Sequence, residues 1–299
     1  KVRIFETKIQ PGSQLADIPL KDLRLPQDVL AGLIFRNNRM IIPHGDDYLL
    51  PNDNTFFVGA SGEIEKFSKH FVGTGIKAPE RVMIIGAGRT GRTLAKMLDK
   101  QGVQVKVIEK DAERSRMVAE RIEEGIVVRG DGTDIDLLTQ EGVGEADVVI
   151  CLTADDKLNL MLALLAKHLG ASRTIVRVAR IEYVDLMEKV GVDIVLSSRL
   201  LAAGEILAFA RRGGVVSVAL LEGAKAEAME VIVQKGSYVE NKKLMDLQLP
   251  KECLICAFVR DDEAFVPTGQ SSLQAGDRAI LFIRMEFANK VMKYFAGKA

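Results

Sequence analysis

The sequence has few cysteines and histidines, no excess of charge of either sign and no long apolar run. Its 41 Lys and Arg residues balance 41 Asp and Glu residues, and no basic patch stands out, so nucleic acid is not expected as a partner. No apolar run reaches the roughly 18 residues that a membrane-spanning helix needs. There is no secretory signal, and three cysteines are too few for a disulfide framework, which favours a reducing cytosol.

The scarce histidines and cysteines also argue against catalysis and metal binding. None of His44, His70 and His168 is placed as a proton donor for hydride transfer would be. Cys253 and Cys256 form a C-x-x-C, but positions i and i+3 of a strand point to opposite faces, which favours packing over redox or metal chemistry. The acids of the loops lie in first helical turns, where carboxylates usually interact with the helix dipole. We therefore expect no catalytic residue and no metal site.

Residues 81–111 follow the pattern of a dinucleotide-binding fingerprint: a strand, a glycine turn, a helix and a second strand that ends in an acid. Residues 82–85 form the apolar run of a buried parallel strand, and Gly86, Gly88 and Gly91 follow in the G-x-G-x-x-G spacing. The first glycine permits the tight turn, the second lets the backbone approach a pyrophosphate, and the third lets the helix pack close to the strand. The free NH groups and the dipole at the helix N-terminus then favour phosphate binding.

Charged residues around this turn indicate which nucleotide it favours. Glu109 ends the second strand, where a carboxylate can accept both ribose hydroxyls of an adenosine. This favours NAD over NADP, since a 2′-phosphate would meet a like charge, although the adjacent Lys110 weakens the preference. Arg89 and Arg92 lie at the start of the helix, where the dipole disfavours cations, so we expect a bound anion to compensate. For Arg92, a side chain that simply extends into solvent is an equal alternative.

Helices and strands alternate with short connections from residue 81 to residue 211. This alternation predicts an α/β fold with a doubly wound parallel sheet, a Rossmann domain. After the fingerprint, the expected elements are helices over residues 112–124, 134–141, 155–169, 182–190 and 199–211, and strands over residues 126–129, 147–152, 174–178 and 192–196.

Ligands of such sheets bind at the carboxyl ends of the strands, so the loops there contain further candidate residues. Asp131, Gly132 and Thr133 follow the third strand and can flank an adenine. Thr153 follows the fourth strand, where both ligand binding and a purely structural function are open. Thr133 and Thr153 each precede an acid by three residues, which also predicts that each caps the following helix.

The chain contains an internal repeat, because residues 12–58 align without a gap with residues 236–282 at an offset of 224. Each copy predicts a strand, a short helical turn and strands on either side of a polar turn, with a short helix after the last strand. The residues that recur include Arg36, Asp53, Arg260 and Asp277.

This repeat indicates the domain organisation. We expect two small α+β modules, residues 1–71 and residues 214–299, on either side of a Rossmann domain of residues 80–213, with a linker at residues 72–79. The chain starts with a lysine inside an apparent strand and has no initiating methionine, so we interpret it as a fragment of a longer chain.

The motifs GAGRTG, VIEKD, GDGTD and LTADDKLN, in a Rossmann domain followed by a small repeated module, resemble the cytosolic regulatory subunits of Trk-type potassium uptake. This is the TrkA family, whose units are RCK domains. The resemblance covers essentially the whole chain, which would be the first half's C-terminal module followed by a complete second half. The first Rossmann domain is missing, so the assembled state of the intact protein is left open.

The resemblance has implications for ligand, partner and location. It implies binding of NAD(H), and in some members of ATP or ADP, as a regulatory signal. It also implies a membrane potassium-translocating subunit as partner, and a cytoplasmic location at the inner face of the cell membrane. The residues that it implies as ligand contacts are Gly86, Gly88, Arg89, Thr90, Gly91, Glu109, Asp131 and Thr133.

Two classes of function compete. A regulatory subunit would bind a nucleotide without consuming it, and the nucleotide would shift the populations of two conformations. An NAD-dependent oxidoreductase with an unusual C-terminal domain would need a proton donor beside the nicotinamide, and the modules supply no His, Lys or Tyr constellation for it. A degenerate Rossmann scaffold used only for assembly is disfavoured by the intact glycines and Glu109. We therefore favour the regulatory subunit and expect no enzymatic activity.

Two helices of the expected Rossmann domain predict self-association. The helix over residues 155–169 is apolar nearly all round and too short to cross a membrane, so it must be buried on more than one side. The helix over residues 199–211 adds further apolar surface. We expect a homodimer at least, formed through these helices; the alternative is that the modules cover them within one chain.

Overall fold

The computed structural model describes residues 2–26, 28–37, 39–72, 79–211 and 214–297. The chain divides into two compact units, one of residues 78–201 and the other of residues 1–77 together with residues 202–299. The division falls inside helix α7 (Ser198–Ala210), whereas the sequence suggested a boundary near residue 213. Most of the expected linker at residues 72–79 lies outside the described residues.

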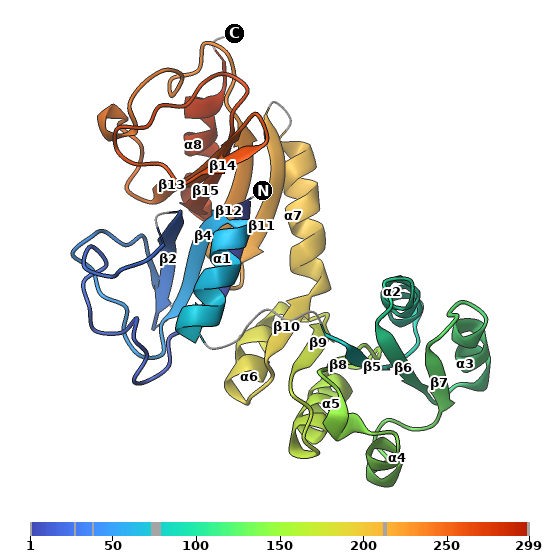
Figure 1. The fold of residues 1–299 in the computed structure, drawn as a ribbon. Coiled ribbons are helices and arrows are strands. Elements are labelled where there is room, and N and C mark those ends of the chain that lie inside the picture. The colour runs from blue at the N-terminus through green and yellow to red at the C-terminus, as the bar shows by residue number, and fades with distance from the viewer. Residues whose placement is uncertain (1, 27, 38, 73–78, 212–213, 298–299) are drawn as a thin grey trace. The chain divides into compact units, whose positions relative to one another are not determined.

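The described residues 79–201 form one six-stranded parallel sheet with helices on both faces (Figure 1). The strand order β10-β9-β8-β5-β6-β7 places the reversal of winding between β5 and β8, and it confirms the expected doubly wound sheet. The strands are β5 (Arg81–Ile85), β6 (Gln104–Glu109), β7 (Ile126–Arg129), β8 (Val148–Cys151), β9 (Thr174–Val178) and β10 (Ile194–Ser197). The helices are α2 (Arg89–Asp99), α3 (Ala112–Ala119), α4 (Ile135–Gln140), α5 (Asp156–His168) and α6 (Val184–Lys189).

Alternating side chains of the strands enter two separate cores, one on each face of this sheet. In β5, Val82 and Ile84 pack with residues of α2 and α3, whereas Met83 and Ile85 pack with residues of α4, α5 and α6. The period of two along a strand produces this alternation, and burial on both faces explains the continuous apolar run. The two cores hold β5 and its neighbours in place, so the loops at their carboxyl ends start from fixed positions.

The helix that follows β6 is shorter than the sequence suggested. We expected it to reach residue 124, but α3 ends at Ala119. The carboxylate of Asp99 accepts hydrogen bonds from the backbone NH groups of Glu123, Glu124 and Gly125 at 2.7, 3.2 and 2.8 Å. These bonds, that from Glu123 foremost, lower the pKa of Asp99 below its ordinary value. The prediction was wrong because a distant side chain binds these NH groups and holds the backbone before β7 outside a helix.

The second unit contains the two modules, each built on an antiparallel sheet. The first sheet has the order β1-β4-β2-β3 and the second the order β11-β12-β15-β13-β14. Every strand of the first sheet recurs 224 residues later with the same bounds, and β11 is the one addition among the described residues of the second sheet. The first set is β1 (Val2–Lys8), β2 (Val29–Arg36), β3 (Arg39–Ile41) and β4 (Asn54–Ala60). The second is β11 (Val215–Leu221), β12 (Ala226–Ile232), β13 (Cys253–Arg260), β14 (Glu263–Phe265) and β15 (Arg278–Arg284).

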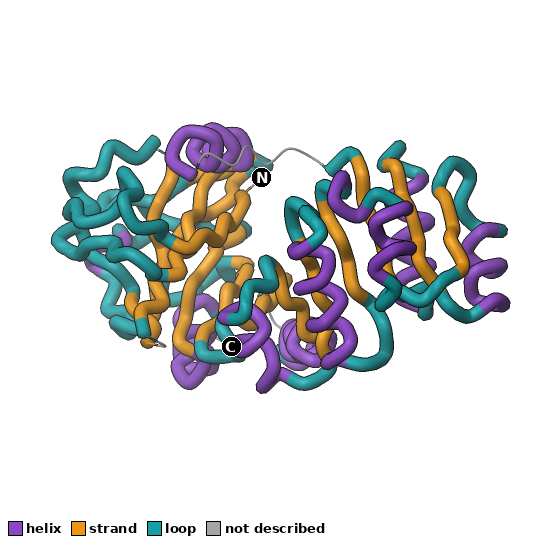
Figure 2. The backbone as a smooth tube through the Cα atoms, turned by 90° about the horizontal axis from the view of Figure 1, so that it is seen from below, coloured by secondary structure: helices purple, strands orange, loops and turns teal. Residues whose placement is uncertain are grey.

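The two modules pack together through one face of each sheet. The shared core includes Phe56 and Val58 of β4 and Phe282 of β15, and the rings of Phe56 and Phe282 meet edge to face at a centroid distance of 6.1 Å. The other face of the first sheet is covered by α1 (Ser61–Phe67), and that of the second by α8 (Ala288–Phe295). Figure 2 shows the strands of this unit gathered together, with helices at the periphery.

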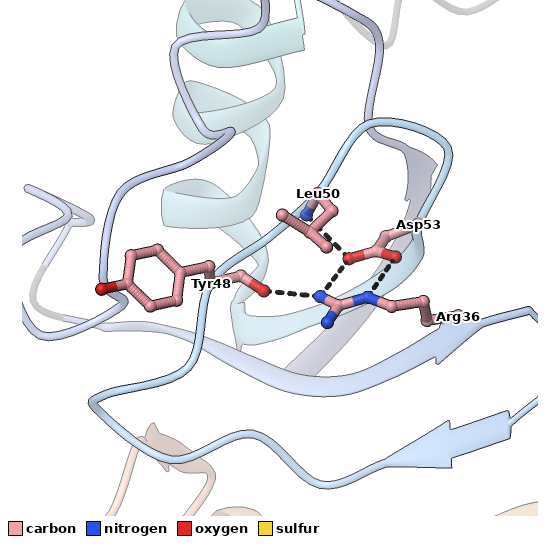
Figure 3. Close-up of polar contacts among 4 residues, drawn as sticks. All are labelled: Arg36, Tyr48, Leu50 and Asp53. Carbon is pink, nitrogen blue, oxygen red and sulfur yellow. Dashed lines mark hydrogen bonds and ion pairs between the residues drawn. The ribbon is translucent and has the colours of Figure 1, made fainter.

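Each module contains the same buried ion pair, which Figure 3 shows for the first module. In the first, Arg36 donates from Nε to Asp53 Oδ1 at 2.9 Å and from Nη2 to Asp53 Oδ2 at 2.7 Å, and Nη2 also donates to the carbonyl oxygen of Tyr48. The backbone NH of Leu50 donates to Asp53 Oδ2 at 2.8 Å, and Asp53 is 1 % exposed. Arg260 and Asp277 repeat this arrangement at 2.9 and 2.6 Å. The recurring pair therefore fixes the loop that leads into β4 and β15.

The two modules have diverged where they meet, and this divergence predicts an energetic coupling. A Cβ added to Gly32 would lie 2.7 Å from Phe282 Cε2, so the glycine makes room for the ring. In the other copy the equivalent positions hold Cys256 and Val58. We expect Gly32→Cys and Phe282→Val each to lower the free energy of unfolding by about 1–3 kcal/mol, through overpacking and a cavity respectively.

The double variant Gly32→Cys/Phe282→Val recreates the pair of residue types that the other copy uses. Its loss of stability in urea denaturation should be smaller than the sum of the two single losses by about 1–2 kcal/mol. Strictly additive losses would contradict the proposed complementarity between Gly32 and Phe282.

Candidate functional site

A cavity of about 660 Å³ lies at the carboxyl ends of β5, β6, β7, β8 and β9. The cavity is lined by all but one of the site residues suggested by the sequence. Gly91 is the exception, because it faces the turn and not the cavity. Contact of these residues with a ligand stays a prediction. The residues that line the cavity as expected are Gly86, Gly88, Arg89, Thr90, Glu109, Lys110, Asp131, Gly132, Thr133 and Thr153.

The three glycines of the turn differ in what a side chain would meet. Gly86 has φ +103°, a region that L side chains rarely adopt. A Cβ on Gly91 would lie 2.0 Å from the carbonyl oxygen of Gly86, so this glycine allows α2 to approach the turn. A Cβ on Gly88 would meet nothing within 4 Å, so that position is open toward the cavity. The first and third glycines therefore serve the fold, while the second keeps space beside the backbone clear.

The start of α2 presents positive charge to the cavity. Its first turn contains no acidic residue, and Gly88 at the N-cap position provides no side chain to cap the free NH groups. Arg89 and Arg92 line the same cavity. Free NH groups, the helix dipole and two guanidinium groups together favour an anion at this end of the helix.

Glu109 is held more firmly than its sequence position suggests. Glu109 is 6 % exposed, and its carboxylate accepts hydrogen bonds from the backbone NH groups of Ala87 at 2.7 Å and Asp111 at 2.9 Å. The side chain thus joins the glycine turn to the start of α3. Because a carboxylate offers about four lone-pair sites, these two bonds leave acceptor capacity for ribose hydroxyls.

The loop after β7 is organised by Asp131. Its Oδ1 accepts from the backbone NH of Thr133 at 3.0 Å and from the Thr133 hydroxyl at 2.9 Å. These bonds, the backbone bond first, lower the pKa of Asp131, so it stays ionised at neutral pH. The expected capping of α4 by Thr133 is wrong, since Asp134 accepts from the NH of Leu137 at 3.1 Å and caps the helix. The Thr133 hydroxyl is already bonded to Asp131.

The loop after β8 is fixed from within α5. Asn159, which is fully buried, accepts on Oδ1 from the NH and hydroxyl of Thr153 at 2.8 and 2.7 Å. The expected cap by Thr153 is therefore also wrong. Asp155 caps α5 by accepting from Lys157 and Leu158, and Asp156 instead accepts from the NH groups of Ala179 and Arg180. The side chains of the LTADDKLN motif thus tie the end of β8 to the end of β9.

Two arginines that the sequence did not single out also line the cavity. Arg114 lies in the first turn of α3, and Arg177 lies on β9. An arginine inside the strand Thr174–Val178, whose other residues are one threonine, one isoleucine and two valines, was the available signal for the second. The lining then contains Arg89, Arg92, Lys110, Arg114 and Arg177 against Glu109, Asp131 and Asp155. This excess of positive charge favours an anionic ligand.

Other kinds of site receive no support from the side chains. Within the described ranges, no group of three or more His, Cys, Asp or Glu side chains could hold a metal ion. Burial raises the pKa of both Cys151 and Cys253 to about 12, which keeps these thiols protonated. None of the helices in the part of the chain that the structure describes is long and apolar enough to cross a membrane.

Comparison with protein families identifies both kinds of unit. The TrkA-N domain matches residues 82–198, and the TrkA-C domain matches twice, at residues 4–72 and 228–296. The chain belongs to the TrkA family. The two TrkA-C matches coincide with the modules of the internal repeat, and the TrkA-N match covers the parallel sheet and the cavity.

Curated relatives extend this result to nearly the whole chain. A Trk system potassium uptake protein TrkA homolog 2 of Methanosarcina mazei is 37% identical over 298 residues, 99% of this chain and 66% of the relative. The TrkA homolog of Archaeoglobus fulgidus is 35% identical, with 99% and 66% covered, and TrkA of Vibrio alginolyticus is 33% identical, with 95% and 63% covered. This TrkA chain thus spans about two thirds of the length of these relatives. Their names are those of potassium uptake proteins and not of enzymes.

The fold is also found in a protein described as the GsuK channel. The GsuK channel superposes with a TM-score of 0.51 at 22% identity, over 98% of this chain and 52% of the channel chain. A form described as the GsuK channel bound to NAD gives 0.50 at 22% identity, with the same coverage. These likenesses support the fold of the chain.

Proposed function

We propose that this TrkA chain senses an adenine nucleotide in the cytoplasm and passes the signal to a membrane potassium-translocating subunit at the inner face of the membrane. The carrying observation is the cavity at the glycine turn, where Gly88 is open, the lining is predominantly cationic and Glu109 lies at the end of β6. The names of the relatives, Trk system potassium uptake proteins, support the membrane partner.

The lining residues suit a nucleoside diphosphate group. The NH groups of the glycine turn and of α2, with Arg89 and Arg92, would hold the phosphates. Glu109 would accept hydrogen bonds from the ribose hydroxyls, which favours NAD(H), while ATP and ADP share the same adenosine diphosphate portion. Asp131 and Thr133 would flank the adenine. This assignment extends to the chain what one fold neighbour's description says of that channel, namely that it binds NAD.

In this function the nucleotide is a signal and not a reactant. Among the described residues that line the cavity there is no His or Tyr, and the single lysine lies next to Glu109, where the ribose is expected. A ligand that binds one conformation more tightly than another shifts their populations by the difference in affinity. Nucleotide exchange could therefore regulate the partner without any chemical step.

The affinity of a Glu109→Ala variant tests the assignment of the ribose site. The loss of a carboxylate that accepts strong hydrogen bonds should weaken binding of both NAD(H) and ATP roughly 10- to 100-fold in calorimetry. Glu109→Gln separates binding from folding, since the amide keeps one acceptor for the NH of Ala87 or Asp111. A matched control is Glu113→Ala, which removes an exposed acid in the first turn of α3 that does not line the cavity. Unchanged affinity in Glu109→Ala would refute the ribose assignment.

We further propose that the chain forms at least a homodimer through helices of the nucleotide-binding unit and α7. Met161 of α5 and Leu201 of α7 are 49% and 61% exposed, and Ile206 of α7 is 66% exposed. Apolar side chains at this exposure are typical of a surface that another chain covers. Light scattering should give a mass of at least two chains at micromolar concentration, and Leu201→Glu/Ile206→Glu should reduce it. A monomer in the unsubstituted chain, with and without nucleotide, would contradict the dimer.

A further inference from the structure

Arg177 presents an unusual combination of burial and unused hydrogen-bonding capacity. It lies on β9 and lines the cavity, and its Nη2 donates to the carbonyl oxygen of Thr153 at 3.0 Å. Its Nε is buried and has no hydrogen-bond partner among the described residues. A guanidinium is always charged, and a buried NH without an acceptor is costly, so this edge of the side chain is suited to an anion.

Two other arginines of this chain show what the Nε and Nη2 side of a guanidinium group binds when an acceptor is present. In Arg36 and Arg260, Nε and Nη2 together donate to the two oxygens of an aspartate, while Nη2 also donates to a backbone carbonyl. Figure 3 shows this arrangement for Arg36. Arg177 has the backbone carbonyl, that of Thr153, but no carboxylate on Nε. A phosphate group offers the same paired oxygens to this fork.

The surroundings hold Arg177 in place. The buried amide of Asn159 donates to the carbonyl oxygens of both Thr153 and Arg177, at 3.1 and 3.0 Å. Thr153 is in turn close to the glycine turn, since a Cβ on Gly86 would lie 3.0 Å from its nitrogen. The backbone that carries the guanidinium is therefore fixed and packed against the turn. Ligand binding then costs little additional side-chain entropy at Arg177.

The strand order indicates which part of a nucleotide Arg177 faces. Glu109 ends β6 and Asp131 follows β7, on one side of β5. Thr153 follows β8 and Arg177 lies on β9, on the other side. The adenosine is expected beside Glu109, and the ligand crosses the sheet at the switch point between β5 and β8. We propose that Arg177 is a second anchor of this site, which binds the phosphate farther from the adenosine and so selects ligands with two or more phosphates. This inference rests on the proposed nucleotide function.

A series of ligands tests the second anchor, with AMP as the ligand that has one phosphate and ADP and NAD⁺ as those that have two. In calorimetry, Arg177→Gln should weaken ADP and NAD⁺ roughly 10- to 100-fold, while AMP changes by less than about 3-fold. Arg177→Lys keeps the charge without the fork, so its affinity for ADP should be intermediate. Arg180→Gln is the charge control: its exposed guanidinium lies 5.7 Å from the Tyr183 ring centroid and outside the cavity lining, so ADP affinity should be unchanged.

The possible outcomes separate this inference from the proposed function. If the unsubstituted chain binds none of the three ligands, the nucleotide function itself fails. If it binds ADP and Arg177→Gln binds ADP equally well, the second anchor is wrong while the nucleotide function stands. The inference would also be overturned if Arg177→Gln lost affinity for AMP and ADP equally. It would be overturned as well if the thermal midpoint of ligand-free Arg177→Gln fell and Arg177→Lys behaved in the same way. Either result would show that Arg177 only supports the Thr153 loop.

Discussion

Gly88→Val should abolish nucleotide binding and leave the stability of the protein unchanged. A Cβ at this position meets nothing within 4 Å, and φ at Gly88 is −61°, which any residue adopts, so the folded chain accommodates the side chain. The added methyl groups would instead occupy the space through which a pyrophosphate approaches the backbone. We expect at least a roughly 100-fold loss of affinity in calorimetry and a thermal midpoint within error of the unsubstituted chain.

Gly91→Ala is the matched contrast to this variant. Its Cβ would lie 2.0 Å from the backbone oxygen of Gly86, a contact that no side-chain rotation relieves. The free energy of unfolding should fall by roughly 1–3 kcal/mol. If Gly88→Val destabilised the chain as much as Gly91→Ala, or bound nucleotide normally, the different functions assigned to the two glycines would be wrong.

Asp53→Ala should be among the most destabilising substitutions in the modules. It removes the acceptor of two Arg36 donors and of the Leu50 NH. It also leaves the Arg36 side chain, which is 30% exposed, without its carboxylate partner. The loss of one partner of a buried ion pair costs about 3–5 kcal/mol. Urea denaturation measures it, and Asp277→Ala should give a similar loss because the same bonds recur there.

An exposed ion pair provides the control for this prediction. Asp46 accepts from Lys21 at 2.6 Å, but its side chain is 86% exposed. Its replacement by alanine should cost only about 0–1 kcal/mol. Equal losses in Asp46→Ala and Asp53→Ala would show that burial of the pair does not determine its contribution.

Sequence patterns within single strands, helices and turns predicted much of the fold. The repeat anticipated that the two modules share one set of strands, because each strand's apolar face and each turn recur at a constant offset. The spacing of Gly86, Gly88 and Gly91 predicted the turn for a mechanical reason that the structure shows at Gly86 and Gly91. Such features depend on neighbours in the sequence, so they can be read from it.

The errors have the opposite origin. The caps at Thr133 and Thr153 were assigned from spacing alone, but several acids in each loop compete, and tertiary contacts decide the outcome. The carboxylate of Asp99 binds backbone NH groups that lie 24 or more residues away in the sequence, and it holds residues 123–125 outside a helix. Arg177 reaches Thr153 across 24 residues of sequence, and only the adjacency of β8 and β9 brings them together. These contacts require the folded sheet, which no local pattern specifies.

Titration calorimetry of this chain with NAD⁺, NADH, ATP and ADP tests the central claim most directly. The account predicts saturable binding of at least one of these nucleotides, with one site per chain and with the heat signal lost in Gly88→Val. Absence of binding by all four nucleotides at millimolar concentration, or binding that persists in Gly88→Val, would contradict it.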